Sequence, residues 1–169
     1  FLVEGKTGFA GPWILFTKPR WNNMGQLTEF LRKSEEAVLG QYEGLTVEAA
    51  RRMHEATYSV GMGAARRFIR QVDLSHRKKI LDLGGGSGAY SITAAKTHAH
   101  IEAVVFDLPP VAEVAREYIA EHGVEDRVSA LGGDFTADPF PTGCDVVVMA
   151  SNLPLYNREI IAQVIKSAF

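Results

Sequence analysis

A glycine-rich turn constrains the fold of this chain more than any other feature of the sequence. Residues 80–90, ILDLGGGSGAY, begin within a predicted apolar strand over 79–83 and lead into a helix predicted from about 90 to 97. Glycines at 84, 86 and 88 let the backbone turn sharply and let a ligand approach it closely. The helix that follows offers free N–H groups and a partial positive charge to an anionic group. The segment therefore predicts a ligand site at the end of a strand.

The glycines alone do not identify the ligand. Gly84, Gly86 and Ala89 also satisfy the fingerprint of dinucleotide-binding proteins. Asp82 lies two positions before the first glycine, where a carboxylate would repel a pyrophosphate. The same carboxylate would suit a ligand with an ammonium and a sulfonium, as S-adenosylmethionine has. Capping of the turn is the alternative explanation of Asp82.

Composition excludes several classes of protein. The 169 residues are 46% hydrophobic and 22% charged, which predicts one globular domain, with room for a helical annex. A net charge of -2 argues against nucleic acid or an anionic membrane as partner. The one cysteine, Cys144, excludes an internal disulfide and fits a reducing compartment, so we expect a cytoplasmic protein. Phe1 and Phe169 both interrupt apparent elements, so we expect an excerpt of a longer chain.

The first 77 residues predict helices more than strands. We expect a strand remnant at 1–3 and a mostly irregular connector up to residue 22. A helix is predicted over 25–38 from the spacing of Leu27, Phe30, Leu31 and Val38. A longer helix is predicted from a cap at Thr46 to about residue 72, either as one helix or as two helices with a kink at Gly61 and Gly63.

The remainder alternates strands with helices. Strands are predicted at 101–107, 128–131 and 145–150, with helices at 111–122 and 158–168. This alternation predicts an α/β fold with a doubly wound, mostly parallel sheet, preceded by the helical segment. Ligands in such sheets bind beyond the carboxyl ends of the strands. Five polar residues fall at those ends: Asp82, Asp107, Asp134, Ser151 and Asn152.

The acids at successive strand ends suit an adenosine. Asp107 ends the second strand, where an acid can accept both ribose hydroxyls, and Leu108 beside it can cover one face of the adenine. Asp134 can accept the adenine amino group, and Phe135 offers a ring for stacking.

Three motifs in this order carry a resemblance to a family. LDLGGGSG (81–88), FDLP (106–109) and GDF (133–135) resemble the small-molecule O-methyltransferases of the class I S-adenosylmethionine-dependent superfamily, such as caffeate and acetylserotonin methyltransferases. The resemblance implies S-adenosylmethionine as cofactor, S-adenosylhomocysteine as product and a small-molecule acceptor. It also implies a homodimer formed through an N-terminal region, and further strands after residue 169. The cofactor-binding residues that it implies are Asp82, Gly84, Gly85, Gly86, Gly88, Asp107, Leu108, Gly133, Asp134, Phe135 and Ser151.

The same resemblance divides the chain into two parts. Residues 1–77 are interpreted as a helical connector and acceptor-pocket segment. Residues 78–169 are interpreted as a Rossmann-like domain that binds S-adenosylmethionine and is incomplete at its C-terminus. The residues expected to line the acceptor pocket are Trp21, Met53, Tyr58, Met62 and Asn152. For the three on the long helix and for Trp21, packing in the core is the alternative.

The chain departs from the family where the general base is expected. The family's histidine after the fourth strand falls on Pro154, or on Leu155 after a slip of one, and a preceding lysine is also missing. Three explanations remain: an acceptor acidic enough to need no base, a substitute base such as His54 or Tyr156, or cofactor binding without catalysis. No catalytic residue is therefore assigned.

Other functional classes remain as alternatives. Residues 152–156, NLPLY, are faintly similar to the NPPY loop of N-methyltransferases, which makes Asn152 a candidate for holding a target amine. A nicotinamide-dependent oxidoreductase shares the glycine turn, but Asp82 and Asp134 count against it. Two loop histidines, His98 and His100, are too few ligands to support a metal site.

Overall fold

The computed structural model describes residues 2–6, 8–32, 42 and 44–168, and its centre is a parallel β-sheet. In this part of the chain the strand order is β3-β2-β1-β4, with β1 at Lys79–Leu83, β2 at Glu102–Asp107, β3 at Val128–Gly132 and β4 at Val146–Val148. Leu81 lies opposite Val104 on one side and Val147 on the other. The predicted α/β sheet is confirmed, and β4 is shorter than the predicted strand.

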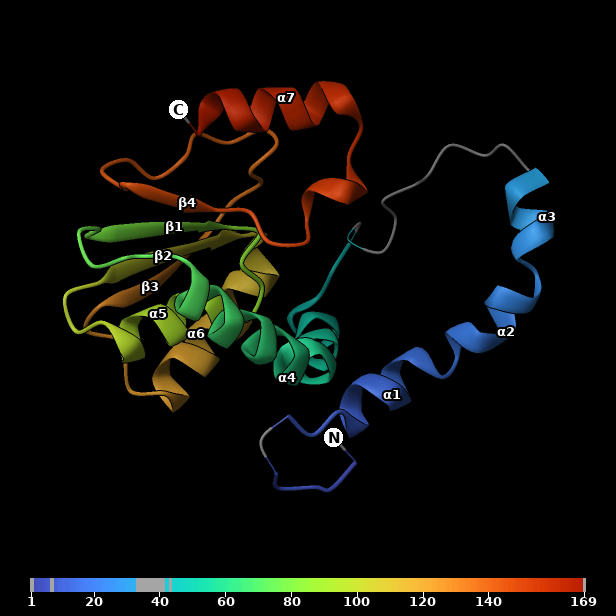
Figure 1. The fold of residues 1–169 in the computed structure, drawn as a ribbon. Helices are drawn as coiled ribbons and strands as arrows, with labels where there is room; N and C mark the ends of the chain where they lie inside the picture. Colours follow the sequence, from blue (N-terminus) through green and yellow to red (C-terminus); the bar gives the residue numbers. More distant parts are fainter. Residues whose placement is uncertain (1, 7, 33–41, 43, 169) are drawn as a thin grey trace.

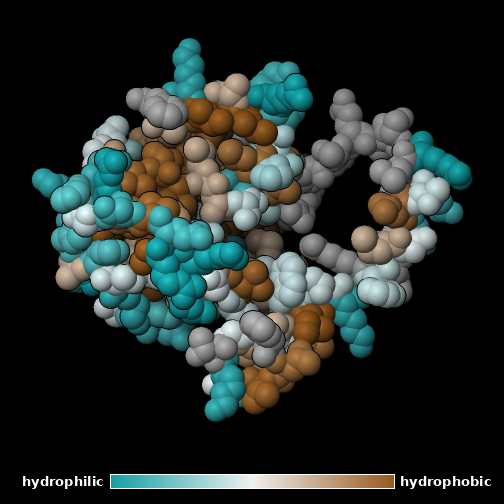
Figure 2. Space-filling model, in the orientation of Figure 1, coloured by the Kyte–Doolittle hydropathy of each residue, from teal (hydrophilic) through white to brown (hydrophobic). Residues whose placement is uncertain are grey.

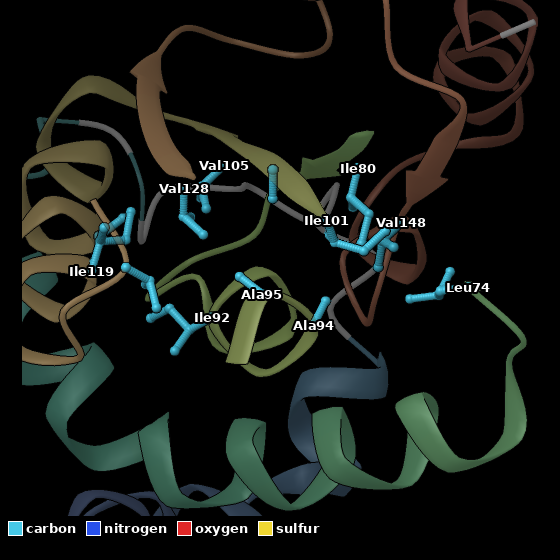
Figure 3. Close-up of a cluster of buried hydrophobic side chains, with 13 residues drawn as sticks. Leu74, Ile80, Ile92, Ala94, Ala95, Ile101, Val105, Ile119, Val128 and Val148 are labelled. Atoms are coloured by element: carbon cyan, nitrogen blue, oxygen red, sulfur yellow. The ribbon is translucent and has the colours of Figure 1, made fainter. Parts of the chain in front are cut away.

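Helices cover both faces of the sheet (Figure 1). On one face lies α7 (Arg158–Ser167), and on the other lie α5 (Ala89–Thr97) and α6 (Pro109–Glu121). Strand side chains alternate between the faces, so Leu81 packs in a cluster with Val164 of α7, whereas Ile80 packs in a cluster with Ile92 of α5. The cluster on the α5 side is shown in Figure 3.

The long helix α4 (Val47–Gln71) packs across α5 and α6. Thr46 caps it, because its Oγ1 accepts a hydrogen bond from the Ala49 N–H at 3.2 Å. The helix continues without interruption through both of its internal glycines, so it is one helix and not two. A Cβ on Gly61 would lie 3.3 Å from the Cβ of Ala89, which explains a glycine here as a close contact between helices.

The N-terminal predictions are partly wrong. Leu2 and Val3 form no strand and are exposed, while Phe1 lies outside the described residues. The expected irregular connector contains α1 (Gly11–Thr17) and the start of α2 (Arg20–Gly25). A proline in the first turn of a helix is tolerated, which is why Pro12 starts α1 rather than preventing it.

The predicted helix over 25–38 is confirmed only in its first half. It corresponds to α3 (Leu27–Arg32), and residues 33–38, with Val38 among them, lie outside the described part of the chain. The division of the chain at residue 77 stays a prediction.

Hydrophobic residues reach the surface in two places on the face drawn in Figure 2: around α1, where several are exposed, and along β4, where Val146 and Val147 are half-buried. On α1 and α2 they include Leu15, which is 69% exposed, and Trp21, which is 81% exposed. β4 lies at the edge of the described sheet. None of the described helices is both long enough and apolar enough to cross a membrane.

Candidate functional site

A cavity of about 540 Å³ opens at the carboxyl ends of the strands. Parallel strands bring their carboxyl ends to one edge of the sheet, which is where the sequence predicts a ligand site. The lining residues follow β1, β2, β3 and β4, and others come from α4, from the start of α6 and from the segment before α4. They are Tyr42, Met53, His54, Gly84, Gly86, Asp107, Leu108, Val111, Asp134, Phe135, Thr136, Ala150, Ser151, Asn152, Leu155 and Tyr156.

The glycine turn lines the cavity with bare backbone. Gly84 and Gly86 have positive φ angles of 61° and 58°, and Gly84 N–H donates to the Phe106 carbonyl at 2.8 Å, which fixes the turn against β2. A Cβ on Gly86 would lie 2.7 Å from the His54 ring, and one on Gly84 would overlap the Asn152 amide nitrogen. Only glycine therefore leaves room between the turn and these two side chains.

Asp107 is held in place by the chain itself. Its Oδ2 accepts a hydrogen bond from Gly86 N–H at 2.8 Å, and its Oδ1 accepts one from Leu108 N–H at 2.7 Å. Burial raises the pKa of this carboxyl, and the two N–H groups act against that rise. Each oxygen keeps a further lone pair for a hydroxyl of a ligand.

The segment after β3 supplies an acid and a ring. Asp134 Oδ1 accepts hydrogen bonds from the N–H and the Oγ1 of Thr136, at 2.8 and 2.6 Å, so the carboxylate is held at the cavity wall. The ring of Phe135 meets that of Tyr156 at a centroid distance of 5.3 Å. Gly133 does not line the cavity, because it lies over the Phe106 ring, which a Cβ would approach to 2.5 Å.

Asp82 lies behind the turn and not at the cavity surface. Residues alternate along β1, so Asp82 points to the same side of the sheet as Ile80, toward α5. It is 1% exposed, and its Oδ2 accepts a hydrogen bond from the Ser91 hydroxyl at 2.9 Å. Burial raises its pKa to about 7, with a smaller contribution from Asp107 and an opposing one from Ser91. Gly85 covers it, while Gly88 begins α5, and neither lines the cavity.

The segment after β4 turns sharply into the cavity. Ser151 has a φ of 67°, and no other non-glycine residue in the described ranges has a positive φ. The next residue, Asn152, donates from Nδ2 to the carbonyl of Leu83. Its Oδ1 is buried and has no hydrogen-bond partner among the described residues. Of the two positions expected for the family's histidine, Leu155 lines the cavity and Pro154 does not.

Helix α4 places His54 above the glycine turn. His54 Nε2 is buried and has no hydrogen-bond partner in the described part of the chain. Burial lowers the pKa of this histidine to about 4, so the imidazole is neutral at pH 7. Met53 of the same helix and Tyr42 complete this wall.

Three residues expected at the acceptor pocket do not line this cavity. Tyr58 stacks on Tyr118 at 4.3 Å and donates its hydroxyl hydrogen to His122 Nε2 at 2.9 Å. Met62 Sδ accepts a hydrogen bond from Thr93, and Trp21 is exposed on α2. Five residues along a helix turn by about 140°, so Met53 and Tyr58 face different neighbours.

Five lining residues were missed by the sequence reasoning. Thr136 directly follows Phe135, and Val111 lies three positions after Leu108. Ala150 precedes Ser151 and Leu155 precedes Tyr156, so longer segments would have included all four. Tyr42 lies in a stretch without periodicity, and no sequence signal identified it. Among the described residues no group of three or more His, Cys, Asp or Glu is placed to hold a metal ion.

Comparison with known proteins identifies the family. Residues 41–168 match the O-methyltransferase domain family. The chain is 33% identical over 152 residues to an L-tyrosine C(3)-methyltransferase of Streptomyces lavendulae, covering 84% of this chain and 42% of that protein. It is 32% identical over 179 residues to the N,N-dimethyltransferase OxyT of Streptomyces rimosus, covering 97% of this chain and 51% of that protein.

A solved structure agrees with this assignment at the level of the fold. Human N-acetylserotonin methyltransferase in complex with SAM superimposes with a TM-score of 0.84 at 20% identity, covering 99% of this chain and 51% of that one. The chain thus spans about half the length of the proteins that it matches. The predicted family is confirmed: this chain belongs to the O-methyltransferase domain family.

Proposed function

We propose that this chain binds S-adenosylmethionine in the cavity and takes part in methyl transfer to an oxygen of a small-molecule acceptor. The observation that carries the proposal is Asp107, fixed by Gly86 and Leu108 N–H groups beside the bare glycine backbone. Membership of the O-methyltransferase domain family supports the same reaction.

The lining residues suit the parts of this cofactor. Asp107 would accept the ribose hydroxyls, and Leu108 and Phe135 would enclose the adenine, with Asp134 beside its amino group. The backbone of Gly84 and Gly86 leaves space for the rest of the molecule. When bound, the cofactor supplies a methyl group on a positively charged sulfur. Asp82 would act from behind the turn, without direct contact.

The described residues favour an acceptor that is already acidic. Neither Pro154 nor Leu155, the two positions expected for the family's histidine, carries a base, and Leu155 lines the cavity. His54 has a pKa of about 4 and is a weak base, and burial raises the pKa of Tyr156, which keeps that phenol protonated. Proximity of donor and acceptor can supply much of the rate without a base. We therefore propose a carboxylate, an enol or an activated phenol as the acceptor.

The missing base can be tested by restoring it. Leu155→His should raise turnover of a simple phenol by about 10²-fold, the usual contribution of a placed base, whereas Pro154→His, outside the cavity lining, should not. Equal effects of the two substitutions would argue against the slipped alignment and for a different acceptor position.

An amine acceptor is the second candidate. Asn152 Oδ1 favours it, because a buried carbonyl oxygen without a partner can hold an N–H group. A relative named as an N,N-dimethyltransferase supports the same alternative. A panel of matched phenols, carboxylic acids and amines, assayed with one cofactor, distinguishes the two classes of acceptor.

The assembly and the location of the protein belong to the same proposal. We propose a homodimer, as the resemblance to the family implies, and a cytoplasmic location, which the lone Cys144 fits. Sedimentation of the full protein tests the first, and fractionation of the source cells tests the second.

Calorimetric titration of the full protein tests the cofactor. S-adenosylmethionine and S-adenosylhomocysteine should bind with dissociation constants of about 10 μM or tighter, and NAD should give no heat. Binding of NAD alone would instead support the oxidoreductase reading of the glycine turn. No binding heat from any of the three ligands would support a relative that has lost the cofactor.

A further inference from the structure

Two buried polar atoms at one end of the cavity have no partner. In the described part of the chain five buried side-chain atoms lack a hydrogen bond, and two of them, His54 Nε2 and Asn152 Oδ1, belong to residues that line the cavity. Leaving a buried polar group unpaired costs about 1–3 kcal/mol. The two atoms are therefore expected to gain partners when a ligand binds.

The orientation of Asn152 is fixed by its other amide atom. Nδ2 must face the Leu83 carbonyl, because only the NH2 group can donate to an oxygen. The left-handed backbone at Ser151 brings Asn152 into this position. Oδ1 is then left as a buried acceptor without a partner among the described residues. Such an oxygen suits a donor, and a positively charged one above all.

His54 approaches the same turn from the opposite wall. Its ring lies above Gly86, two residues from Gly84, and α4 carries it. Burial lowers the histidine pKa to about 4, so at pH 7 the ring has one N–H and one bare nitrogen. A ligand that brings an anionic oxygen to Nε2 would select the tautomer with hydrogen on that nitrogen.

The strand order indicates which end of the cofactor reaches His54 Nε2 and Asn152 Oδ1. Across the sheet the order is β3-β2-β1-β4, and the residues suited to adenosine follow β2 and β3. Asn152 follows β4, on the far side of β1, and His54 lies above the turn after β1. With the nucleoside at the β2 and β3 end, the amino-acid end of the cofactor lies at the β1 and β4 end.

We infer that Asn152 and His54 together hold the zwitterion of the cofactor's methionine part. Asn152 Oδ1 accepts a hydrogen bond from the ammonium, and His54 Nε2–H donates one to the carboxylate. The inference rests on the proposed function, because it assigns partners within the same cavity. Held at both charged groups, the amino-acid end fixes where the sulfur and its methyl group lie.

Three adenosine ligands of decreasing size test the assignment by calorimetry on the full protein. S-adenosylhomocysteine has both charged groups, its decarboxylated analogue keeps only the ammonium, and 5′-methylthioadenosine has neither. Asn152→Ala should weaken the first two by about 10- to 100-fold and leave the third within about twofold. His54→Phe, which keeps a ring above Gly86, should weaken only the first.

A control comes from the same helix. Ser59 also has a buried hydroxyl without a partner in the described residues, but it does not line this cavity. Ser59→Ala should leave all three affinities unchanged.

The three ligands separate this inference from its alternatives. Parallel losses for all three ligands would mean that Asn152 or His54 only shapes the turn, and would overturn the inference while the proposed function stands. Unchanged affinities in both variants would overturn it as well, and would leave Asn152 to face the acceptor. No binding of any ligand by the unchanged protein would overturn the proposed function and the inference with it.

Discussion

At the β2 and β3 end of the cavity, the chain has already paired its own polar groups, whereas at the β1 and β4 end it has not. Asp107 accepts two backbone N–H groups, and Asp134 accepts the N–H and hydroxyl of Thr136. His54 Nε2 and Asn152 Oδ1 are buried at the other end without partners. The first end is formed before any ligand arrives, and the second is completed by one.

The two ends of the cavity should therefore contribute differently to ligand binding. Carboxylates that are held by short local hydrogen bonds cost little to order on binding, so the nucleoside end should supply affinity in every ligand. The unpaired atoms reward only ligands that carry complementary charges, so they should supply selectivity.

Gly84→Ala should have the largest effect, because Gly84 lies where the two ends meet. The added Cβ would overlap the Asn152 amide and lie 3.1 Å from the Phe135 ring, at a φ of 61°. We expect a loss of more than about 3 kcal/mol in the free energy of unfolding, by clash and backbone strain together, and loss of cofactor binding. Chemical denaturation measures the first and calorimetry the second.

Gly123→Ala is the matched control for Gly84. Its φ is 62°, but nothing lies within 4 Å of the added Cβ. It therefore isolates the cost of the left-handed backbone, about 1–2 kcal/mol. Equal losses at both positions would mean that Gly84 matters only for its φ and not for the approach of Asn152.

Acid should destabilise the protein through His54. Its pKa is lowered from 6.5 to about 4, so between these pH values the unfolded state binds a proton that the folded state does not bind. The stability is present above pH 6.5 and is lost as the pH falls toward 4, by up to about 3 kcal/mol. Unfolding curves of the unchanged protein and of His54→Phe, compared from pH 4 to 8, isolate this effect.

Asp82 should act in the opposite direction in the same range. Its folded-state pKa of about 7 lies above its ordinary value of 3.8, so its stability is present below pH 3.8 and is lost as the pH rises through 7. Asp82→Asn should therefore reduce the loss of stability that accompanies a rise in pH. An unchanged pH slope in this variant would argue that Asp82 is not buried as the structure has it.

Asp107→Ala should weaken every adenosine ligand by about 1–3 kcal/mol, because charge-assisted hydrogen bonds to the ribose are lost. The same loss for S-adenosylhomocysteine and 5′-methylthioadenosine is expected, since both carry the ribose. Titration of the two ligands side by side gives the answer. A loss of affinity confined to S-adenosylhomocysteine would argue that Asp107 does not bind the ribose.

Thr46→Ala should have the smallest effect. The substitution removes the cap of α4 and costs about 1 kcal/mol of stability. Because α4 carries His54, the affinity for S-adenosylhomocysteine should fall slightly more than that for 5′-methylthioadenosine. Thermal unfolding and the same titrations measure both effects. Equal losses of affinity for the two ligands would argue that α4 does not position a partner of the cofactor's amino-acid end.

The parts predicted well from sequence share one physical property. The β1 strand, the glycine turn and Asp107 are specified by local patterns, because apolar strands and positive-φ glycines depend on neighbours in the chain. The same patterns placed Asp134, Phe135 and Asn152 at one edge of the sheet, since parallel strands must end together.

The parts predicted poorly depend on tertiary packing. The pocket residues predicted on α4 could not be divided into cavity and packing residues from sequence. Tyr58 contacts His122, 64 residues away, and Met62 contacts Thr93, 31 residues away. Asp82 was assigned to the ligand because the direction of its side chain depends on which face of β1 meets α5. The connector predicted up to residue 22 contains α1, because Pro12 lies in the first turn of that helix, where a proline is tolerated.

A crystal structure of the full protein with S-adenosylhomocysteine would locate both ends of the ligand in the cavity. We expect the ribose hydroxyls at Asp107, the adenine between Leu108 and Phe135, and the amino-acid end between Asn152 and His54. An adenosine bound with its base at the β1 and β4 end, or a ligand bound outside this cavity, would contradict this expectation.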